Sequence, residues 1–139
     1  MVSTTTTTEF DETIASACRT AVGDSLRTVI YFTPDSFDVL YVRDDLYDGE
    51  EEAVRRVKEL FVENERIGFG DAETYRKLTP EPNVEPDVGE YQFTMRIFEY
   101  GFLSRVIEGD RGVLTTTDGL QIDAFKELAV TLRKLLAEA

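Results

Sequence analysis

The chemistry open to this chain is limited first by the residue types that it lacks. It contains no histidine, and its one cysteine is Cys18. Histidine is the commonest general base and metal ligand, and one cysteine can form neither an intramolecular disulfide nor a cysteine-based metal cluster. Cys18 falls on the apolar face of a predicted helix, where a buried thiol is inert. We therefore expect no catalytic residue, no metal, no cofactor and no enzymatic activity.

The densest acidic cluster lies between Asp44 and Glu52. Its carboxylates could offer oxygen ligands to Ca²⁺ or Mg²⁺, and a metal-dependent hydrolase built on them is the least favoured alternative. The spacing does not match an EF-hand loop, because counting from Asp44 puts Leu46 at the third position and Arg55 at the twelfth. A solvated helix start is the favoured interpretation. The members are Asp44, Asp45, Asp48, Glu50, Glu51 and Glu52.

Arginines and tyrosines in or beside apolar strands are the candidate ligand contacts. A guanidinium on a sheet can bind an anionic ligand or form a forked pair with a carboxylate such as Asp38, Asp44 or Glu99, and pairing is favoured. Tyrosines on strands can line a pocket, although cross-strand packing is more usual. Arg105 and Tyr91 share these features. The candidate ligand-binding residues are Arg43, Arg96, Tyr31 and Tyr41.

Three helices and five strands must position these side chains. Helical periodicity predicts helices that begin at Glu9, at Glu50 to Glu52 and after Asp118, with Gly68 and Gly70 ending the second. The inner stripe of that second helix is predicted to be Ala53, Val54, Val57, Leu60, Phe61 and Asn64. Extended patterns predict strands at 26–33, 37–42, 91–98, 102–107 and 113–117, with Leu26, Thr28, Ile30 and Phe32 sharing one face of the first.

The element order predicts the fold class and the domain organisation. The order α-β-β-α-β-β-β-α indicates one α+β domain with a five-stranded antiparallel sheet flanked by three helices. Residues 1–8 are rich in threonine and are predicted to form a disordered tail, so the domain covers 9–139. Residues 71–89 hold three of the four prolines and are predicted to form a long loop, which can include a helical turn near Ala72 to Leu78.

The charge balance restricts location and partners. The chain has 28 acidic and 15 basic residues, for a net charge of -13 over 139 residues. Such a surface repels itself in dilute buffer, whereas molar salt shortens the Debye length to about 3 Å. The composition therefore suits a salt-rich cytoplasm, as in halophilic archaea, and disfavours nucleic acid as a partner. The sequence shows neither a signal peptide nor an apolar run of about 20 residues, so we expect a cytoplasmic protein that does not enter a membrane.

The last helix carries the widest apolar arc. Leu132, Leu135 and Leu136 either complete the core of one chain or cover a second copy, and the sequence leaves both open. They are the candidate homodimer interface.

The chain resembles two known groups of proteins, one in two stretches of its sequence and one in the order of its elements. The stretches at 26–46 (LRTVIYFTPDSFDVLYVRDDL) and 91–119 (YQFTMRIFEYGFLSRVIEGDRGVLTTTDG) resemble a group of small haloarchaeal proteins, which implies no activity. The matching positions are Leu26, Arg27, Asp35, Tyr41, Arg43, Asp44 and Asp45. The element order is similar to the roadblock/profilin-like arrangement, which implies a dimeric scaffold, a GTPase-regulatory module or a ligand sensor.

The expected function is therefore binding. We expect a non-enzymatic regulatory module that forms a homodimer and can bind a regulatory protein. The alternative is a sensor for a small anionic molecule, with a pocket between the sheet and the 71–89 loop and with Arg96 or Arg43 contacting the anion.

Overall fold

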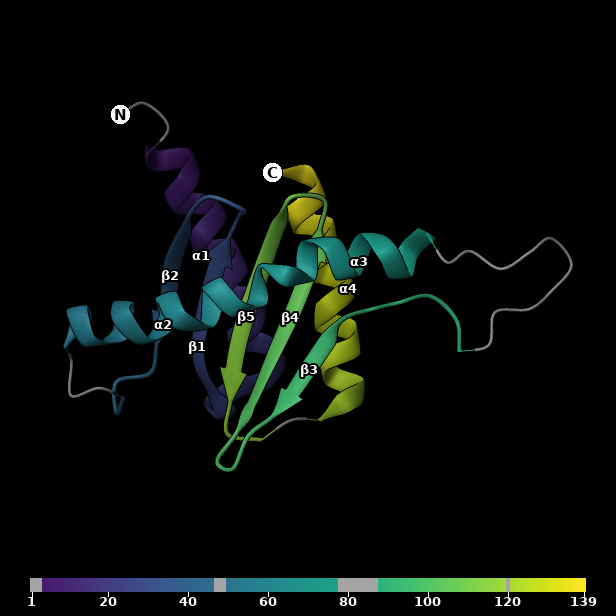
Figure 1. The fold of residues 1–139 in the computed structure, drawn as a ribbon. Coiled ribbons are helices and arrows are strands. Elements are labelled where there is room, and N and C mark those ends of the chain that lie inside the picture. Colours follow the sequence, from purple (N-terminus) through teal and green to yellow (C-terminus); the bar gives the residue numbers. More distant parts are fainter. Residues whose placement is uncertain (1–3, 47–49, 78–87, 120) are drawn as a thin grey trace, which may run out of the picture.

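The fold is one antiparallel sheet with helices on both faces (Figure 1). The computed structural model describes residues 4–46, 50–77, 88–119 and 121–139. The strand order is β2-β1-β5-β4-β3, and every neighbouring pair is antiparallel. This confirms the α+β class and the element order. The strands are β1 (Leu26–Phe32), β2 (Phe37–Val42), β3 (Thr94–Ile97), β4 (Phe102–Glu108) and β5 (Arg111–Thr117).

The helices form two separate layers. In Figure 1, α2 (Glu51–Glu65) and α3 (Ile67–Lys77) cross the front of the sheet, while α1 (Thr4–Val22) and α4 (Ile122–Glu138) lie behind it. The second predicted helix is thus two consecutive helices, and a short 3₁₀ turn, η1 (Gly23–Ser25), joins α1 to β1. Among the described residues, no helix combines the length and the apolar character needed to cross a membrane.

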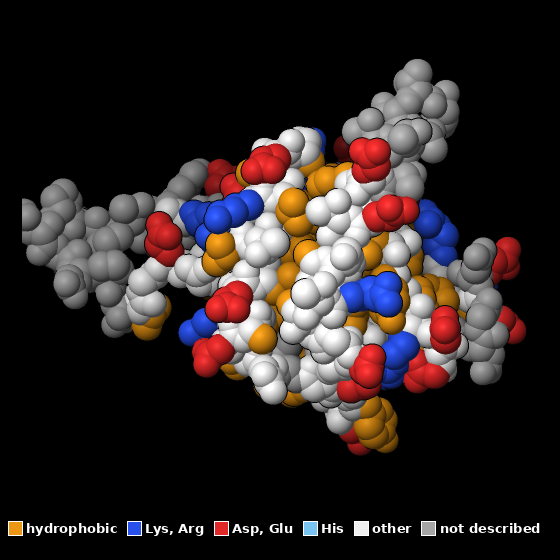
Figure 2. Space-filling view, turned by 180° about the vertical axis from the view of Figure 1, so that it is seen from behind, with side chains coloured by type: hydrophobic (Ala, Val, Ile, Leu, Met, Phe, Trp, Pro, Cys, Tyr) orange, Lys and Arg blue, Asp and Glu red, His pale blue; other side chains and the backbone are white. Residues whose placement is uncertain are grey.

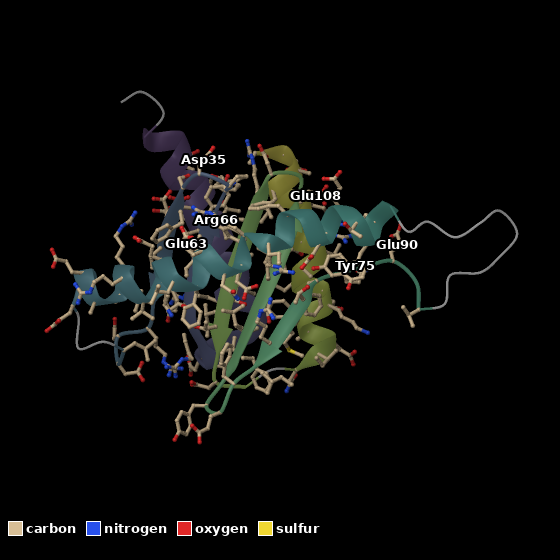
Figure 3. All side chains as sticks on the ribbon, viewed as in Figure 1. Asp35, Glu63, Arg66, Tyr75, Glu90 and Glu108 are labelled. Carbon is tan, nitrogen blue, oxygen red and sulfur yellow. The ribbon has the colours of Figure 1, made fainter. Side chains whose placement is uncertain are left out.

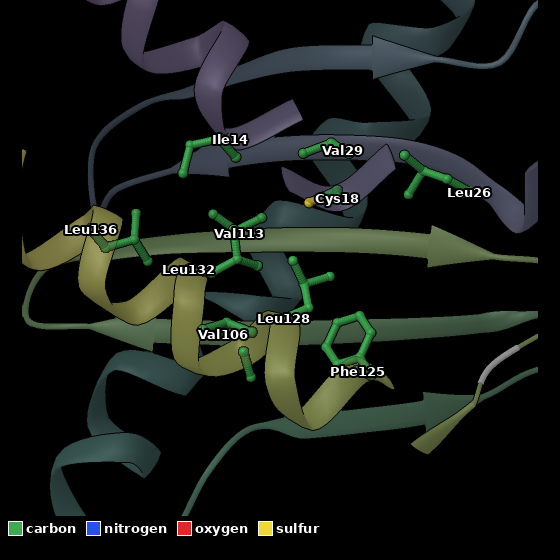
Figure 4. Packing of buried hydrophobic residues seen from close by; sticks show 11 residues of the cluster. Ile14, Cys18, Leu26, Val29, Val106, Val113, Phe125, Leu128, Leu132 and Leu136 are labelled. Carbon is green, nitrogen blue, oxygen red and sulfur yellow. The ribbon is translucent and has the colours of Figure 1, made fainter. Parts of the chain in front are cut away.

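Strand alternation divides the core into two apolar clusters. Val29 packs under α1 and α4, whereas the next residue, Ile30, packs under α2 and α3. Both faces of β1 are therefore covered, as its apolar sequence predicts. Figure 4 shows the α1/α4 cluster, which consists of Ile14, Cys18, Leu26, Val29, Val106, Val113, Phe125, Leu128, Ala129, Leu132 and Leu136. The α2/α3 cluster consists of Ile30, Phe32, Val62, Ala72, Leu103, Ile107 and Leu114.

One predicted face assignment in β1 is wrong. The sequence pattern puts Leu26 on the same face as Ile30, but Leu26 packs with Val29 in the α1/α4 cluster. The pairing of β1 with β5 shifts register between Leu26 and Thr28. Such an irregularity inserts an extra residue and moves the side chains before it to the opposite face.

The predicted helix stop at Gly68 and Gly70 is also wrong. The helical turn allowed near Ala72 to Leu78 in the predicted loop is, in its described part, the end of a longer helix. Both glycines lie inside α3, which continues to Lys77. A Cβ on Gly68 would lie 2.3 Å from Arg105 Nε, so the glycine lets α3 approach the sheet closely. Gly68 therefore has a packing reason to lie inside a helix despite a propensity cost of about 1 kcal/mol, whereas a Cβ at Gly70 would meet nothing within 4 Å. Residues 78–87 of the predicted loop lie outside the described residues.

The N-terminal boundary differs in the same way. Residues 4–8, predicted to be disordered, form the first part of α1, and residues 1–3 lie outside the described residues. Phe10 and Ile14 pack against the sheet and so nucleate the helix. Each further residue added towards the N-terminus then gains one backbone hydrogen bond, which makes extension easier than nucleation. The third strand begins at Thr94, three residues later than its alternating pattern suggests.

Candidate functional site

Lys58 is the most unusual side chain on α2. It occupies the inner stripe of the helix with Val54, Val62 and Glu65, and its exposed fraction is only 3 %. Its Nζ lies 4.9 Å from the centroid of the Phe61 ring. Burial, followed by the nearby positive charge of Arg27, lowers the pKa of Lys58 from 10.5 to about 8. A position that the helical pattern reserves for an apolar residue thus holds an amine.

Lys58 lines a pocket of ≈ 350 Å³ between α2 and the hairpin that joins β3 to β4. Arg27, at the start of β1, lines the same pocket. The rings of Phe61 and Phe98 meet edge to face across it, with centroids 6.3 Å apart. The other lining residues are Val57, Glu99, Tyr100, Gly101, Phe102, Leu103, Thr116 and Thr117.

Gly101 lets the hairpin close this pocket. A Cβ at that position would lie 2.5 Å from the carbonyl oxygen of Thr117 on β5, so no larger residue fits without displacing the backbone. Phe98 donates its backbone N–H to the carbonyl oxygen of Gly101 over 2.8 Å, which holds the turn together. Tyr100, 82 % exposed, then lies at the rim.

An ion cluster holds Arg27 beside the pocket. Its Nη1 lies 2.8 Å from Asp118 Oδ1. Arg43 contacts the same carboxylate and also pairs with Asp45, with 2.7 Å between Arg43 Nε and Asp45 Oδ1. Hydrogen bonds from Arg43 and Arg27 hold the pKa of Asp118 below its usual value. The cluster ties the ends of β1, β2 and β5 together.

A second ion network is buried beneath α2 and α3. Glu65 and Arg105 are each 1 % exposed, and Arg105 Nη1 lies 2.8 Å from Glu65 Oε1. Arg96 Nε lies 2.6 Å from the other oxygen of Glu65. Arg105 also donates to Thr94 Oγ1 over 3.1 Å and lies 3.7 Å from Asp71. The network joins two strands to two helices, and its buried charges compensate each other.

Comparison with known families gives one assignment. A family model described as a domain of unknown function, DUF7522, matches residues 12–137. The chain belongs to the DUF7522 family. A search of the curated proteins found no match. The family description states no function, so the role of this DUF7522 domain must be argued from its own residues.

The four predicted ligand-binding residues of the DUF7522 domain do not meet in one pocket. Arg96 pairs with Glu65, and Arg43 pairs with Asp45 and Asp118. Arg43 also borders a separate pocket of ≈ 510 Å³ between β2 and α2. The two tyrosines lie on the opposite face of the sheet, where Tyr31 contacts the Phe10 ring and Tyr41 lies under the Arg19 guanidinium. Tyr91 stacks on Tyr75 of α3.

The predicted dimer residues are used inside one chain. Leu132 and Leu136 are buried in the α1/α4 cluster, and Leu135 packs against it partly buried. Figure 2 shows this face of the DUF7522 domain, where acidic and basic side chains surround scattered apolar atoms. These leucines therefore complete the core of their own chain.

The acidic cluster shows no metal geometry in the part that the structure describes. Within the described residues, no group of three or more histidine, cysteine, aspartate or glutamate side chains could hold a metal ion. Asp48 lies outside the described residues. Burial raises the pKa of the Cys18 thiol to about 12, so at neutral pH it is a protonated core side chain.

Sequence reasoning missed Lys58 because it took the inner stripe of α2 one position out of phase. Leu60 was placed inside that stripe, yet it is 72 % exposed. At the break between α2 and α3, Arg66 Nε donates to the carbonyl oxygen of Thr33 over 3.1 Å. Arg66 Nη1 also lies 3.6 Å from Glu63 Oε1, and Figure 3 labels these two residues. A charged residue four positions after Val54 and four before Val62 was the available signal.

Proposed function

We propose that this DUF7522 domain is a non-enzymatic binding module whose ligand is a small organic anion with a flat apolar body. The proposal rests on one observation: two cationic side chains, Lys58 and Arg27, line the same aromatic pocket. Its volume of ≈ 350 Å³ lies in the range of small-ligand sites and suits one ring with an acidic group.

The electrostatics favour an anion at this place. Arg27 and Lys58 repel each other across the pocket, since the charge of Arg27 lowers the pKa of Lys58. A carboxylate or phosphate between them would relieve that repulsion and replace water that burial has removed. The net charge of -13 for the whole chain makes this local positive potential more selective, because an anion is repelled from most of the surface.

The rings give the ligand its second feature. Phe61, Phe98 and Phe102 line the pocket, and an aromatic ligand can stack or meet them edge to face. The order of elements, a helix, a hairpin, a helical arm, a three-strand meander and a last helix, supports the roadblock/profilin-like resemblance. Ligand sensors are among the roles that this resemblance implies.

The test is an NMR titration with benzoate and phenyl phosphate as probes. We expect the amide signals of Phe61, Gly101 and Thr116 to shift progressively up to about 10 mM probe, a range that covers millimolar affinity. Arg27→Gln and Lys58→Met should each weaken binding about tenfold or more, since each removes one charged hydrogen bond. Lys126→Met, on the exposed side of α4, is the matched control. Binding that is equal in all four proteins, or absent from the pocket signals with both probes, contradicts the proposal.

A protein partner is the second candidate, and the exposed apolar side chains near the pocket favour it. Leu60 on α2, Ile97 on β3 and Tyr100 on the hairpin are all more than half exposed. A second copy of the chain or a regulatory protein could cover them. Light scattering in roughly 2–3 M KCl, where charge repulsion is screened, tests the homodimer. A monomer at every concentration reached would exclude the homodimer.

The salt-rich cytoplasm expected from the sequence remains part of the proposal. The support is the acidic composition, which implies repulsion that salt screens. Urea unfolding at low and molar KCl tests it, and an unfolding free energy that does not rise with KCl would exclude it.

A further inference from the structure

We propose that Lys58 is a reactive group, which forms a reversible imine with a ligand that carries both an aldehyde or ketone and an acidic group. The inference rests on the proposed function, since it adds a bond to a ligand held in the same pocket. It assigns a chemical class to that ligand: a small oxo acid with an apolar body.

The position of Lys58 suits this chemistry. The side chain is almost wholly buried yet lines the pocket, and the Phe61 ring holds its amine at 4.9 Å. Arg27 lines the same pocket and can bind the acidic group of the ligand. A ligand held by its acid at Arg27 would bring its carbonyl group towards the amine, and such positioning raises the rate of a reaction between two groups.

The protonation state of Lys58 supports the same assignment. Only a neutral amine attacks a carbonyl carbon, and burial in an apolar site is one of the ways in which proteins activate lysine. With its pKa lowered to about 8, about half of the Lys58 amine is neutral at pH 8. For a lysine with the ordinary pKa of about 10.4, less than about 1 % is neutral at that pH.

The reaction balances without any further reagent. The amine lone pair attacks the carbonyl carbon, the nitrogen loses one proton and the carbonyl oxygen gains one, which gives a carbinolamine. The C–O bond then breaks as the nitrogen loses its second proton, so that the C=N bond forms and the oxygen leaves as water. One water molecule is released for each imine, and nothing is oxidised or reduced.

The charged groups around Lys58 shape its pH dependence. Arg27 faces it from β1, while Glu99 and the phenol of Tyr100 line the pocket from the hairpin. On α2 itself the charged neighbours Arg55 and Glu59 are exposed to solvent. Arg27 acts in the same direction as burial, and both favour the neutral amine.

The experiment traps the imine by reduction. The protein is incubated with 4-formylbenzoate and sodium cyanoborohydride, and the modified lysines are mapped by peptide mass spectrometry. We expect Lys58 to be modified at least about tenfold faster than Lys126 and Lys134, both exposed on α4, because a far larger fraction of its amine is neutral. The rate should rise around pH 8. Benzaldehyde, which lacks the acid, should react more slowly at Lys58 and equally at the other two.

A conservative variant separates this inference from the proposed function. Lys58→Arg keeps a cation but cannot form the trapped adduct, so its pocket amides should still shift with benzoate. If 4-formylbenzoate shifts the pocket amides of the natural chain but Lys58 reacts no faster than Lys126, the imine is excluded and the binding site stands. If neither shifts nor selective adducts are seen, both proposals fail.

Discussion

The two faces of the sheet differ in what they bury. Under α1 and α4 the core cluster consists of apolar side chains and the thiol of Cys18. The buried hydroxyls of Thr115 and Ser104 lie on the same face, since Thr115 pairs with Val29 and Ser104 pairs with Thr115. Under α2 and α3 the apolar cluster is smaller, and the same layer holds Lys58, Glu65 and Arg105 almost without exposure. Removing charges from water costs several kcal/mol per ion before any pairing is counted. The α1/α4 face therefore contributes most clearly to stability, while the α2/α3 face contains the groups that we propose recognise a ligand.

This difference also separates two uses of buried charge within one face. The carboxylate of Glu65 lies 2.6 Å from Arg96 Nε and 2.8 Å from Arg105 Nη1. These opposite charges compensate one another and hold helices to strands. Lys58 and Arg27 have the same sign and line one pocket, and Arg27 also pairs with Asp118. The first arrangement is a structural tie, and the second is the one that we propose as an anion site.

Breaking the structural tie should have the largest effect. We expect Glu65→Ala to lower the free energy of unfolding by about 3–5 kcal/mol, because it leaves Arg105 buried beside Arg96 without its carboxylate. Urea unfolding in molar KCl measures this. The double variant Glu65→Leu with Arg105→Met should regain much of the loss, since it removes both charges. A loss of less than about 1 kcal/mol for Glu65→Ala is what an exposed ion pair would give. That result would contradict the prediction that the buried network stabilises the fold.

The apolar face should respond by volume instead of charge. Leu132→Ala is expected to lower the free energy of unfolding by about 2–5 kcal/mol, because the side chain is fully buried and its loss leaves a cavity. The loss should hardly change with KCl concentration. Val130→Ala, on the exposed side of the same helix, is the matched control and should cost well under 1 kcal/mol or so. A loss at Leu132 that depends on protein concentration would show that it also contacts a second copy.

The buried amine of Lys58 in the proposed ligand pocket should make the free energy of unfolding depend on pH. The pKa of Lys58 is about 8 in the folded chain and 10.5 in its ordinary state, so between these values the unfolded chain binds more protons. Stability therefore rises with pH across the window from 8 to 10.5, and the gain persists above it. Relative to Lys58→Met, which removes this titration, we expect a rise of about 2–3 kcal/mol over that window. Parallel curves for the two proteins would mean that Lys58 is solvated.

Much of the fold could be predicted because it depends on local patterns. The apolar, β-rich run of β1 and the long apolar stripe of α4 indicate a covered strand and a terminal helix before any contact is known. The errors arose where a contact distant in sequence decides local structure. Gly68 reads as a helix stop until the Arg105 side chain that packs against it is known. The Leu26 face depends on register with β5 in the same way.

The site was harder to predict than the fold. Arg96 lies in β3 and Arg43 directly follows β2, and a sequence does not say which carboxylate lies opposite each one. Lys58 could have been recognised from the phase of α2 alone, whereas its meeting with Arg27 depends on β1 and α2 packing together. The proposed site thus combines a charged residue in an apolar helical stripe with one at the start of a strand.

The exposed ion cluster next to the pocket should give the smallest effect and sharpen the contrast with the buried one. Asp118→Asn is expected to lower the free energy of unfolding by under about 1 kcal/mol, since the side chain is nearly half exposed and water screens its pairs with Arg27 and Arg43. Because the pKa of Asp118 is lowered from 3.8, its contribution is present above that pH and is lost as the pH falls through the folded-state pKa. Molar KCl should weaken it further, whereas the cost of Glu65→Ala should persist. Urea unfolding of both variants at low and high KCl makes the comparison. An equal salt response of the two variants would mean that burial does not distinguish the two ion clusters. The contrast drawn between the buried network and the exposed cluster would then be wrong.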